Sequence, residues 1–232
     1  MPFEQQLIVE GIRAAVAVLA LLLTWRFGQP IIARWDMRKK RRELDLALSN
    51  DFQRLFGEYK EIWRLWKAHY EATKPTSKQT IGAAAVDTTR WELFARAAAA
   101  EGRVEAVFMK LAVDRPLSSR DLQMLGYFRQ AFQILRQGIR DGEHLNYSNN
   151  DPRYQLFIVL GCWVAYIINR DSHALPPSAD KVQKNLVTIQ SYRSDEWEEA
   201  VVAWSQGTPL PMNTSATRIL DESAVPVPAQ KP

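Results

Sequence analysis

The sequence predicts an all-α protein with a single N-terminal transmembrane helix, a cytoplasmic bundle of about five helices and a disordered C-terminal tail. Apolar residues recur every three or four positions over long stretches, which is the spacing of a helix that buries one face. The alternation of apolar and polar residues that marks a strand never lasts for more than a few positions. An uncharged segment, residues 14–25, precedes five consecutive cations at residues 38–42. We therefore expect a membrane anchor (1–35), a helical bundle (36–207) and a Pro-rich tail (208–232).

Composition narrows the classes of protein and site that the chain can contain. The net charge is +4, and five of the 30 Lys and Arg residues stand at residues 38–42, so the rest of the chain is almost neutral. We therefore expect no nucleic-acid-binding surface. The single cysteine, Cys162, excludes an intramolecular disulfide and suits a reducing compartment. The 10 glycines are too few for a protein built on phosphate-binding loops.

Three interpretations are open for the N-terminal segment: a cleaved export signal, a membrane-spanning helix, or a helix that is buried or lies at an interface. A cleaved signal is the weakest of them. Glu4 and Glu10 stand where a signal peptide is basic, and Trp25 and Arg26 stand where it ends in small residues. Residues 14–25 extend only about 18 Å as a helix, whereas the hydrocarbon core of a bilayer is about 30 Å thick.

The arginines at its two ends make this short span compatible with a bilayer. Arg13 and Arg26 lie about 10 Å on either side of Ala20, and side chains of that length can extend to the interface. Trp25 and Trp35 stand where an aromatic belt is expected. The sequence therefore favours membrane insertion.

The distribution of cations predicts the orientation of this span. Arg13 is the cation before the span, whereas seven cations follow it closely. The positive-inside rule therefore places the N-terminus outside and the rest of the chain in the cytoplasm, with the span in a bacterial inner (plasma) membrane. The basic run at 38–42 is also expected to contact anionic lipid headgroups. The residues assigned to anchoring and topology are Arg13, Trp25, Arg26, Trp35, Arg38, Lys39, Lys40, Arg41 and Arg42.

A long amphipathic helix is predicted to begin at Leu44. Its apolar positions are 44, 48, 52, 55, 59, 62, 66 and 69/70, which are three or four residues apart. Phe56, Trp63 and Tyr70 widen the stripe beyond a narrow seam. This favours packing inside a bundle, with self-association as a coiled coil through 44–70 as the second interpretation.

Two further amphipathic helices follow a loop predicted at residues 73–89. Thr89 and Glu92 have the spacing of a capping box, which would open a helix that extends to about Val113. Its candidate core residues are Trp91, Phe94, Ala98, Val104, Phe108 and Leu111. Residues 115–121 would end this helix and cap the next one, for which Gly142 is the expected end.

Residues 154–169 carry no charge and permit two interpretations. They could form a second membrane span, although they extend only about 24 Å as a helix. The sequence favours the other interpretation, in which they form the central helix of the bundle that the amphipathic helices need as a packing partner. Asn150 or Asp151 would cap the helix, with Pro152 in its first turn.

The C-terminal part is predicted to contain two short helices and a tail. Ser178 would cap the first helix, and Ser194 would cap the second, whose acidic first turn suits the helix dipole. Gly207 would end it. Residues 208–232 contain five prolines and little apolar periodicity, so we expect them to be disordered.

No recognisable catalytic chemistry is present, and we predict no catalytic, cofactor-binding or metal-binding residues and no enzyme. His69, His144 and His173 have no partner at the spacing of metal ligands. Cys162 is expected to be a small buried apolar residue rather than a nucleophile. The polar loop 141–154 could bind a ligand, but turn formation and helix capping explain most of its residues.

These features favour a membrane-anchored cytoplasmic helical protein that acts as an interaction, scaffold or sensor module. The expected partners are membrane lipid and either another protein or a second copy that associates through the 44–70 helix. The alternative is a membrane-active effector of the defence or toxin type, which would need residues 154–169 to form a second span.

Overall fold

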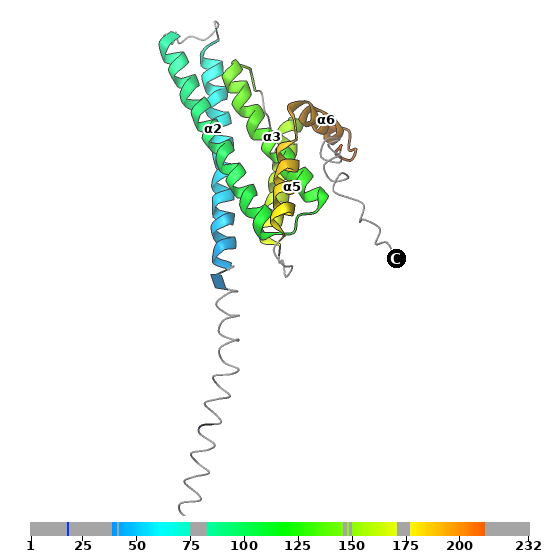
Figure 1. Ribbon diagram of the computed structural model, residues 1–232. Coiled ribbons are helices and arrows are strands. Elements are labelled where there is room, and N and C mark those ends of the chain that lie inside the picture. The colour runs from blue at the N-terminus through cyan, green and yellow to red at the C-terminus, as the bar shows by residue number, and fades with distance from the viewer. Residues whose placement is uncertain are drawn as a thin grey trace, which may run out of the picture. The chain divides into compact units, whose positions relative to one another are not determined.

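The computed structural model describes residues 18, 39–40, 42–74, 83–145, 148, 150–170 and 177–211. All regular secondary structure within these residues is helical, so the chain is an all-α protein in the part that the structure describes (Figure 1). The chain divides into two compact units, Met1–Ala47 and Leu48–Pro232. The described residues of the first unit are 18, 39–40 and 42–47, and the second unit contains a helical bundle.

The bundle is built on one unlabelled helix and five labelled ones. Residues 42–72 are helical, and those from Leu48 belong to the second unit, where we call them the 48–72 helix. The others are α2 (Ala83–Asp114), α3 (Ser119–Asp141), α4 (Pro152–Asn169), α5 (Ala179–Gln190) and α6 (Ser194–Ser205). Helix α3 contacts α2, α4, α5 and α6, and is therefore the central element of the bundle.

The 48–72 helix buries the stripe that its spacing predicts, from Leu48 through Phe52, Leu55, Tyr59, Ile62 and Trp66. Leu44 was expected to extend this stripe, and that prediction is wrong because its side chain is 55% exposed. The buried stripe begins at Leu48, which is also the first residue of the second unit. The regular spacing of apolar residues therefore begins before the first residue that is buried in the core.

Helix α2 begins at Ala83, so the capping box predicted at Thr89 is wrong. Alanine has the highest helix propensity, and the alanines at 83–85 allow the helix to start six residues earlier. The predicted buried face is wrong in its first turns, where Trp91 is exposed and Leu93 and Ala97 are buried, but Val104, Phe108 and Leu111 are buried as predicted. The end of the helix, at Asp114, agrees with the predicted end near Val113.

The helix ends predicted from local sequence are confirmed at four positions. Ser118 and Asp121 form a capping box at the beginning of α3, and Gly142 ends this helix with a φ of 74°, a conformation that favours glycine. The Asp151 side chain caps α4, and the Ser178 side chain caps α5. At α6 the prediction is wrong, because Arg193 occupies the N-cap and its backbone N–H donates to Glu196, while Ser194 is the first helical residue.

Helix α4 is a core helix, as the favoured interpretation predicted. Leu156, Phe157, Leu160, Val164 and Ile168 are at most 1% exposed. Among the described residues no helix has both the length and the apolar character that crossing a bilayer requires. The predicted N-terminal span at 14–25 lies outside the described residues except for Val18, which is helical.

Stacked aromatic rings form the centre of the core and join three helices. The Phe157 ring of α4 lies 3.9 Å from the ring of Tyr59 and 5.2 Å from that of Phe128, centroid to centroid. Phe128 in turn contacts Phe132 on α3 and Phe52 on the 48–72 helix. The uncharged sequence of α4 is thus explained by what it packs against.

The outer face of α4 overturns one prediction. Cys162 is exposed, not buried. Its neighbours Gly161 and Val164 face the core, so the cysteine falls on the solvent side of the helix. Gln155 and Asn169, seven residues before and after Cys162, are also exposed and mark this outward face, a signal that the prediction did not use.

Helices α5 and α6 and the start of the predicted tail pack on α3. The Tyr192 ring, between α5 and α6, lies so close to Gly126 on α3 that a Cβ at that glycine would stand 2.2 Å from a ring carbon. The first residues of the predicted tail are also attached to α3, because Gln123 donates hydrogen bonds to the carbonyls of Leu210 and Pro211. Residues 212–232 lie outside the described residues.

Candidate ligand-binding groove

A candidate site lies in a groove between the 48–72 helix and α2. Its volume is about 550 Å³. Leu48 and Leu55, seven residues apart, line it from one helix, and Ala106 and Val107 line it from the other. Leu48, Leu55 and Val107 form its floor because they belong to the buried stripes that hold the two helices together, whereas Ala106 is exposed beside them.

The rim of the groove is cationic. The charged residues of its lining are Asp51 and Arg54 on the 48–72 helix and Arg103 and Lys110 on α2. Each stands one helical turn or less from a floor residue, so each is carried at the edge of a buried stripe. The groove therefore carries three positive charges against one negative charge.

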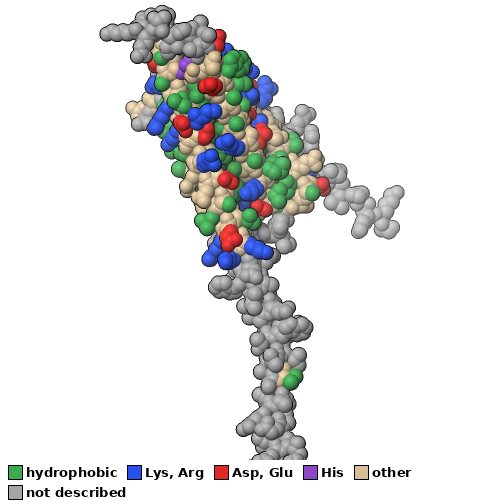
Figure 2. Space-filling view, turned by 90° about the vertical axis from the view of Figure 1, so that its left-hand side faces the viewer, with side chains coloured by type: hydrophobic (Ala, Val, Ile, Leu, Met, Phe, Trp, Pro, Cys, Tyr) green, Lys and Arg blue, Asp and Glu red, His purple; other side chains and the backbone are tan. Residues whose placement is uncertain are grey.

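None of these four charged side chains makes an ion pair with another described residue. The cations elsewhere between the same helices do: the Arg96 guanidinium lies 2.9 Å from the carboxylate of Glu58 and 3.3 Å from that of Glu61. Figure 2 shows one face of the molecule, on which Lys and Arg side chains are interspersed with Asp and Glu. In the groove the positive and negative charges are not balanced in this way, so its excess positive charge is available to a ligand.

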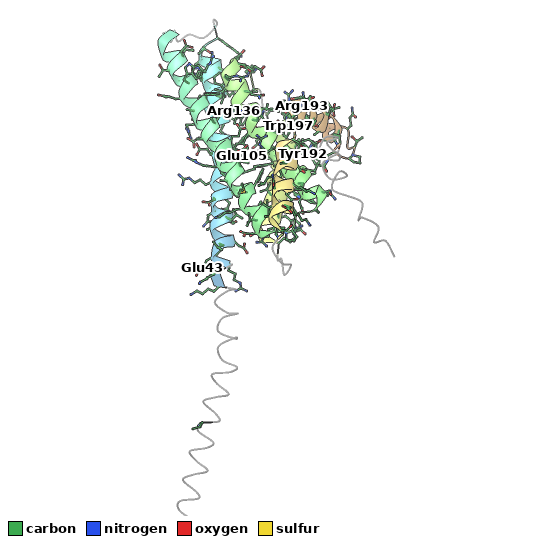
Figure 3. All side chains as sticks on the ribbon, viewed as in Figure 1. Glu43, Glu105, Arg136, Tyr192, Arg193 and Trp197 are labelled. Carbon is green, nitrogen blue, oxygen red and sulfur yellow. The ribbon has the colours of Figure 1, made fainter. Side chains whose placement is uncertain are left out.

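Between α2 and α3 the charges are likewise matched. The Arg129 guanidinium lies 3.0 Å from the Glu105 carboxylate, and Arg136 lies 2.6 Å from Glu101, which is almost buried. Figure 3 labels Glu105 and Arg136 on these two helices. These pairs join the helices and leave no net charge for binding.

A second, polar cavity of about 540 Å³ lies beside the turn between α5 and α6. Figure 3 shows Tyr192, Arg193 and Trp197 at this turn. Its lining includes Arg129, Gln133, Arg193 and Asp195. It is the weaker candidate because Arg129 is already neutralised by Glu105, and Arg193 lies 3.5 Å from Asp195.

The described residues include no group of three or more His, Cys, Asp or Glu side chains placed to hold a metal ion. His69 packs against Trp66, with 5.5 Å between ring centroids, as expected for a histidine at the end of the stripe. Burial, and to a smaller extent Arg90, lowers the pKa of His69. His144 is exposed, its ring stacks on that of Tyr70, and its Nε2 lies 3.1 Å from the Glu71 carboxylate.

The polar loop that was considered as a ligand site contributes to structure where it is described. The indole N–H groups of Trp63 and Trp66 donate to the carbonyls of Leu145 and Glu143, respectively, which fixes the loop against the 48–72 helix. Asp151 caps α4. Tyr147 and Asn149 lie outside the described residues.

Most of the residues assigned from sequence to anchoring and topology lie outside the described part of the chain; these are Arg13, Trp25, Arg26, Trp35, Arg38 and Arg41. Lys39, Lys40 and Arg42 are described, and all three are helical and exposed. Sequence reasoning did not select Arg54, Arg103 or Lys110. The seven-residue spacing of Arg103 and Lys110 was a usable signal, but their approach to Arg54 depends on how two helices pair.

Comparisons of the chain with protein-family models, with curated proteins and with solved structures find no match.

Proposed function

We propose that the chain is a membrane-anchored cytoplasmic helical module that recognises a partner at the inner face of the membrane, as a scaffold or sensor rather than as an enzyme. The observation that carries this proposal is the groove between the 48–72 helix and α2, whose three cations have no ion-pair partner among the described residues. Unneutralised charge around a formed groove is suited to binding and offers neither a nucleophile nor an acid–base pair.

The membrane location is supported by the order of features along the chain. An uncharged segment at 14–25 is followed by the basic run at 38–42, which predicts an external N-terminus and a cytoplasmic bundle. Lys39, Lys40 and Arg42 are exposed and can meet anionic headgroups. The inner (plasma) membrane is therefore the proposed location.

Self-association through the 44–70 helix stays a prediction with a narrower basis. From Leu48 to Trp66 the apolar stripe is used inside the bundle, so it offers no free surface to a second copy. Leu44, Leu46 and Leu65, which are 55%, 65% and 41% exposed, are the large apolar residues of this helix that a second copy could cover.

The effector alternative receives no such support. It needs residues 154–169 to enter the bilayer, whereas α4 buries Leu160 and Val164 completely in the bundle. Removing that helix would expose the aromatic rings that pack on Phe157.

The test of the proposed location uses the exposed Cys162 of the full chain as a topological reporter. We expect alkaline carbonate to leave the chain in the membrane fraction. We also expect a membrane-impermeant maleimide to label Cys162 in lysed spheroplasts and not in intact ones, because the bundle is cytoplasmic.

The Cys162→Ser variant controls for labelling at other sites, and a chain lacking residues 1–35 should appear in the soluble fraction. Release of the full chain by carbonate, or labelling of Cys162 in intact spheroplasts, would contradict the proposal. Protection of Cys162 after lysis would instead favour the second span.

A further inference from the structure

We infer that the groove between the 48–72 helix and α2 binds the headgroup of an anionic phospholipid that carries hydroxyl groups, such as phosphatidylglycerol. This inference rests on the membrane location proposed above and names the ligand of the same groove.

Most of the floor of the groove offers a partner helix little apolar surface to cover. Leu48, Leu55 and Val107 are only 4%, 4% and 5% exposed, because they already pack between the two helices. A partner helix would gain little by covering them, since hydrophobic stabilisation scales with the apolar area removed from water. These three residues therefore add little to the hydrophobic contact on which helix-in-groove recognition depends.

The cations are placed to surround a small anion. Arg103 and Lys110 are two helical turns apart on α2, about 10 Å along its axis, and Arg54 faces them from the neighbouring helix. A phosphodiester between them would meet guanidinium groups, which bind phosphate oxygens in pairs, and an ammonium group. The volume of about 550 Å³ is of the size that small ligands occupy.

The one carboxylate of the lining narrows the ligand class. Asp51 would repel a polyanion such as a nucleic acid, but it can accept hydrogen bonds from the hydroxyl groups of a polyol headgroup. A singly charged phosphodiester with a hydroxylated headgroup satisfies both the cations and this acceptor. A choline headgroup has no hydroxyl group to donate and no net negative charge.

The position of the groove in the chain identifies a membrane lipid rather than a free metabolite as the source of this phosphate. Leu48 follows Arg42, the last residue of the basic run, by six residues. A basic run that follows an apolar span marks the layer of anionic headgroups. The residues of the groove therefore begin close to the basic run along the chain.

The test is a calorimetric titration of the full chain in neutral detergent micelles with dioctanoyl phosphatidylglycerol. We expect saturable binding that weakens at least tenfold in the Arg103→Gln/Lys110→Gln variant, because each substitution removes a charged hydrogen-bond donor to the phosphodiester. The matched control is Lys181→Gln/Lys184→Gln, which removes two exposed cations of α5 outside the groove and should bind as the unmodified chain does. Circular dichroism checks that each variant is folded.

Three further ligands decide between sources of the anion. Dioctanoyl phosphatidylcholine and inorganic phosphate should each bind at least tenfold more weakly than phosphatidylglycerol. Equal binding of either ligand, or no loss in the Arg103→Gln/Lys110→Gln variant, would overturn the inference. An acidic amphipathic helical peptide that binds more tightly than the lipid would overturn it as well and indicate a protein partner.

The outcomes for the groove and for the anchor are separable. The titration needs no bilayer, so a chain that carbonate releases from membranes but that binds phosphatidylglycerol contradicts only the anchor. A chain that resists carbonate but fails to bind the lipid contradicts only the groove assignment.

Discussion

Asp121 is a buried carboxylate that joins the beginning of α3 to the end of α4. It is 1% exposed and accepts hydrogen bonds from the Ser118 backbone N–H and hydroxyl at 2.9 and 2.8 Å. The Trp163 indole and the Arg170 guanidinium each approach it to 3.2 Å. Burial alone would raise the pKa of Asp121, but the Ser118 hydrogen bonds and the charge of Arg170 hold it below its ordinary value of 3.8.

We predict that Asp121→Asn lowers the free energy of unfolding by about 3 kcal/mol, because it leaves Arg170 without its partner and replaces an ionised acceptor. The measurement is urea unfolding of the full chain in non-ionic detergent. Asp141→Asn, at an exposed carboxylate near the end of the same helix, should leave the midpoint unchanged. A similar loss in both variants would show that Asp121 has no special role.

The same carboxylate predicts a pH dependence. Because its pKa is lower in the folded than in the unfolded chain, the folded state binds fewer protons in acid. The stabilisation is fully present above about pH 4 and is lost as the pH falls through the folded pKa. The Asp121→Asn variant should lack this part of the acid-induced loss, and parallel pH profiles for the two proteins would contradict the assignment.

At the scale of elements, two glycines in helix interiors provide a matched comparison. A Cβ at Gly102 on α2 would meet no atom within 4 Å, whereas one at Gly126 on α3 would enter the Tyr192 ring. Helix propensity favours alanine over glycine by about 0.5–1 kcal/mol at both positions, so any difference between the two variants in the free energy of unfolding comes from packing.

We therefore predict opposite signs for the same substitution. Gly102→Ala should raise the free energy of unfolding by about 0.5–1 kcal/mol. Gly126→Ala should lower it, because Tyr192 is a buried ring between α5 and α6 and cannot move aside without displacing these helices. Thermal unfolding of both variants gives the comparison. Stabilisation by Gly126→Ala would show that the α5–α6 turn does not pack closely on α3.

Helix ends were predictable where one side chain determines them and not where neighbouring residues compete. Ser118, Asp151 and Ser178 each cap the helix that follows directly in the sequence. The N-cap predicted at Thr89 is wrong because the alanines before it extend α2. The N-cap predicted at Ser194 is wrong because the Glu196 carboxylate accepts a hydrogen bond from the backbone N–H of Arg193, which makes Arg193 the N-cap. A capping pattern identifies a possible start, but helix propensity around it decides which start is used.

At the scale of the whole molecule, the helical class and the core position of α4 followed from periodicity and charge. The groove did not. Arg54 is 49 residues from Arg103 in the chain, and their meeting depends on the register in which two helices pair. That register is set by the packing of floor residues such as Leu55 and Val107, and no local pattern contains it.

The aromatic core makes a further prediction at this scale. Phe157→Ala should lower the free energy of unfolding by about 4 kcal/mol, because the ring contacts Tyr59 and Phe128 on two other helices. Unfolding followed by tryptophan fluorescence and by circular dichroism should remain a single coincident transition. Phe157→Leu should cost less because it leaves a smaller cavity, and equal losses would show that the ring stacking, rather than the volume, holds the helices together.

The seam between α3 and the α5–α6 pair has a consequence for how the protein moves. Four buried polar atoms there have no hydrogen-bond partner in the described part of the chain: Gln130 Oε1, Asn185 Nδ2, Thr188 Oγ1 and Trp197 Nε1. Local opening would hydrate each of them and return part of a penalty of about 1–3 kcal/mol per group. We therefore expect the C-terminal pair of helices to open at a lower free-energy cost than α3 and α4, so that its amides exchange with solvent before theirs.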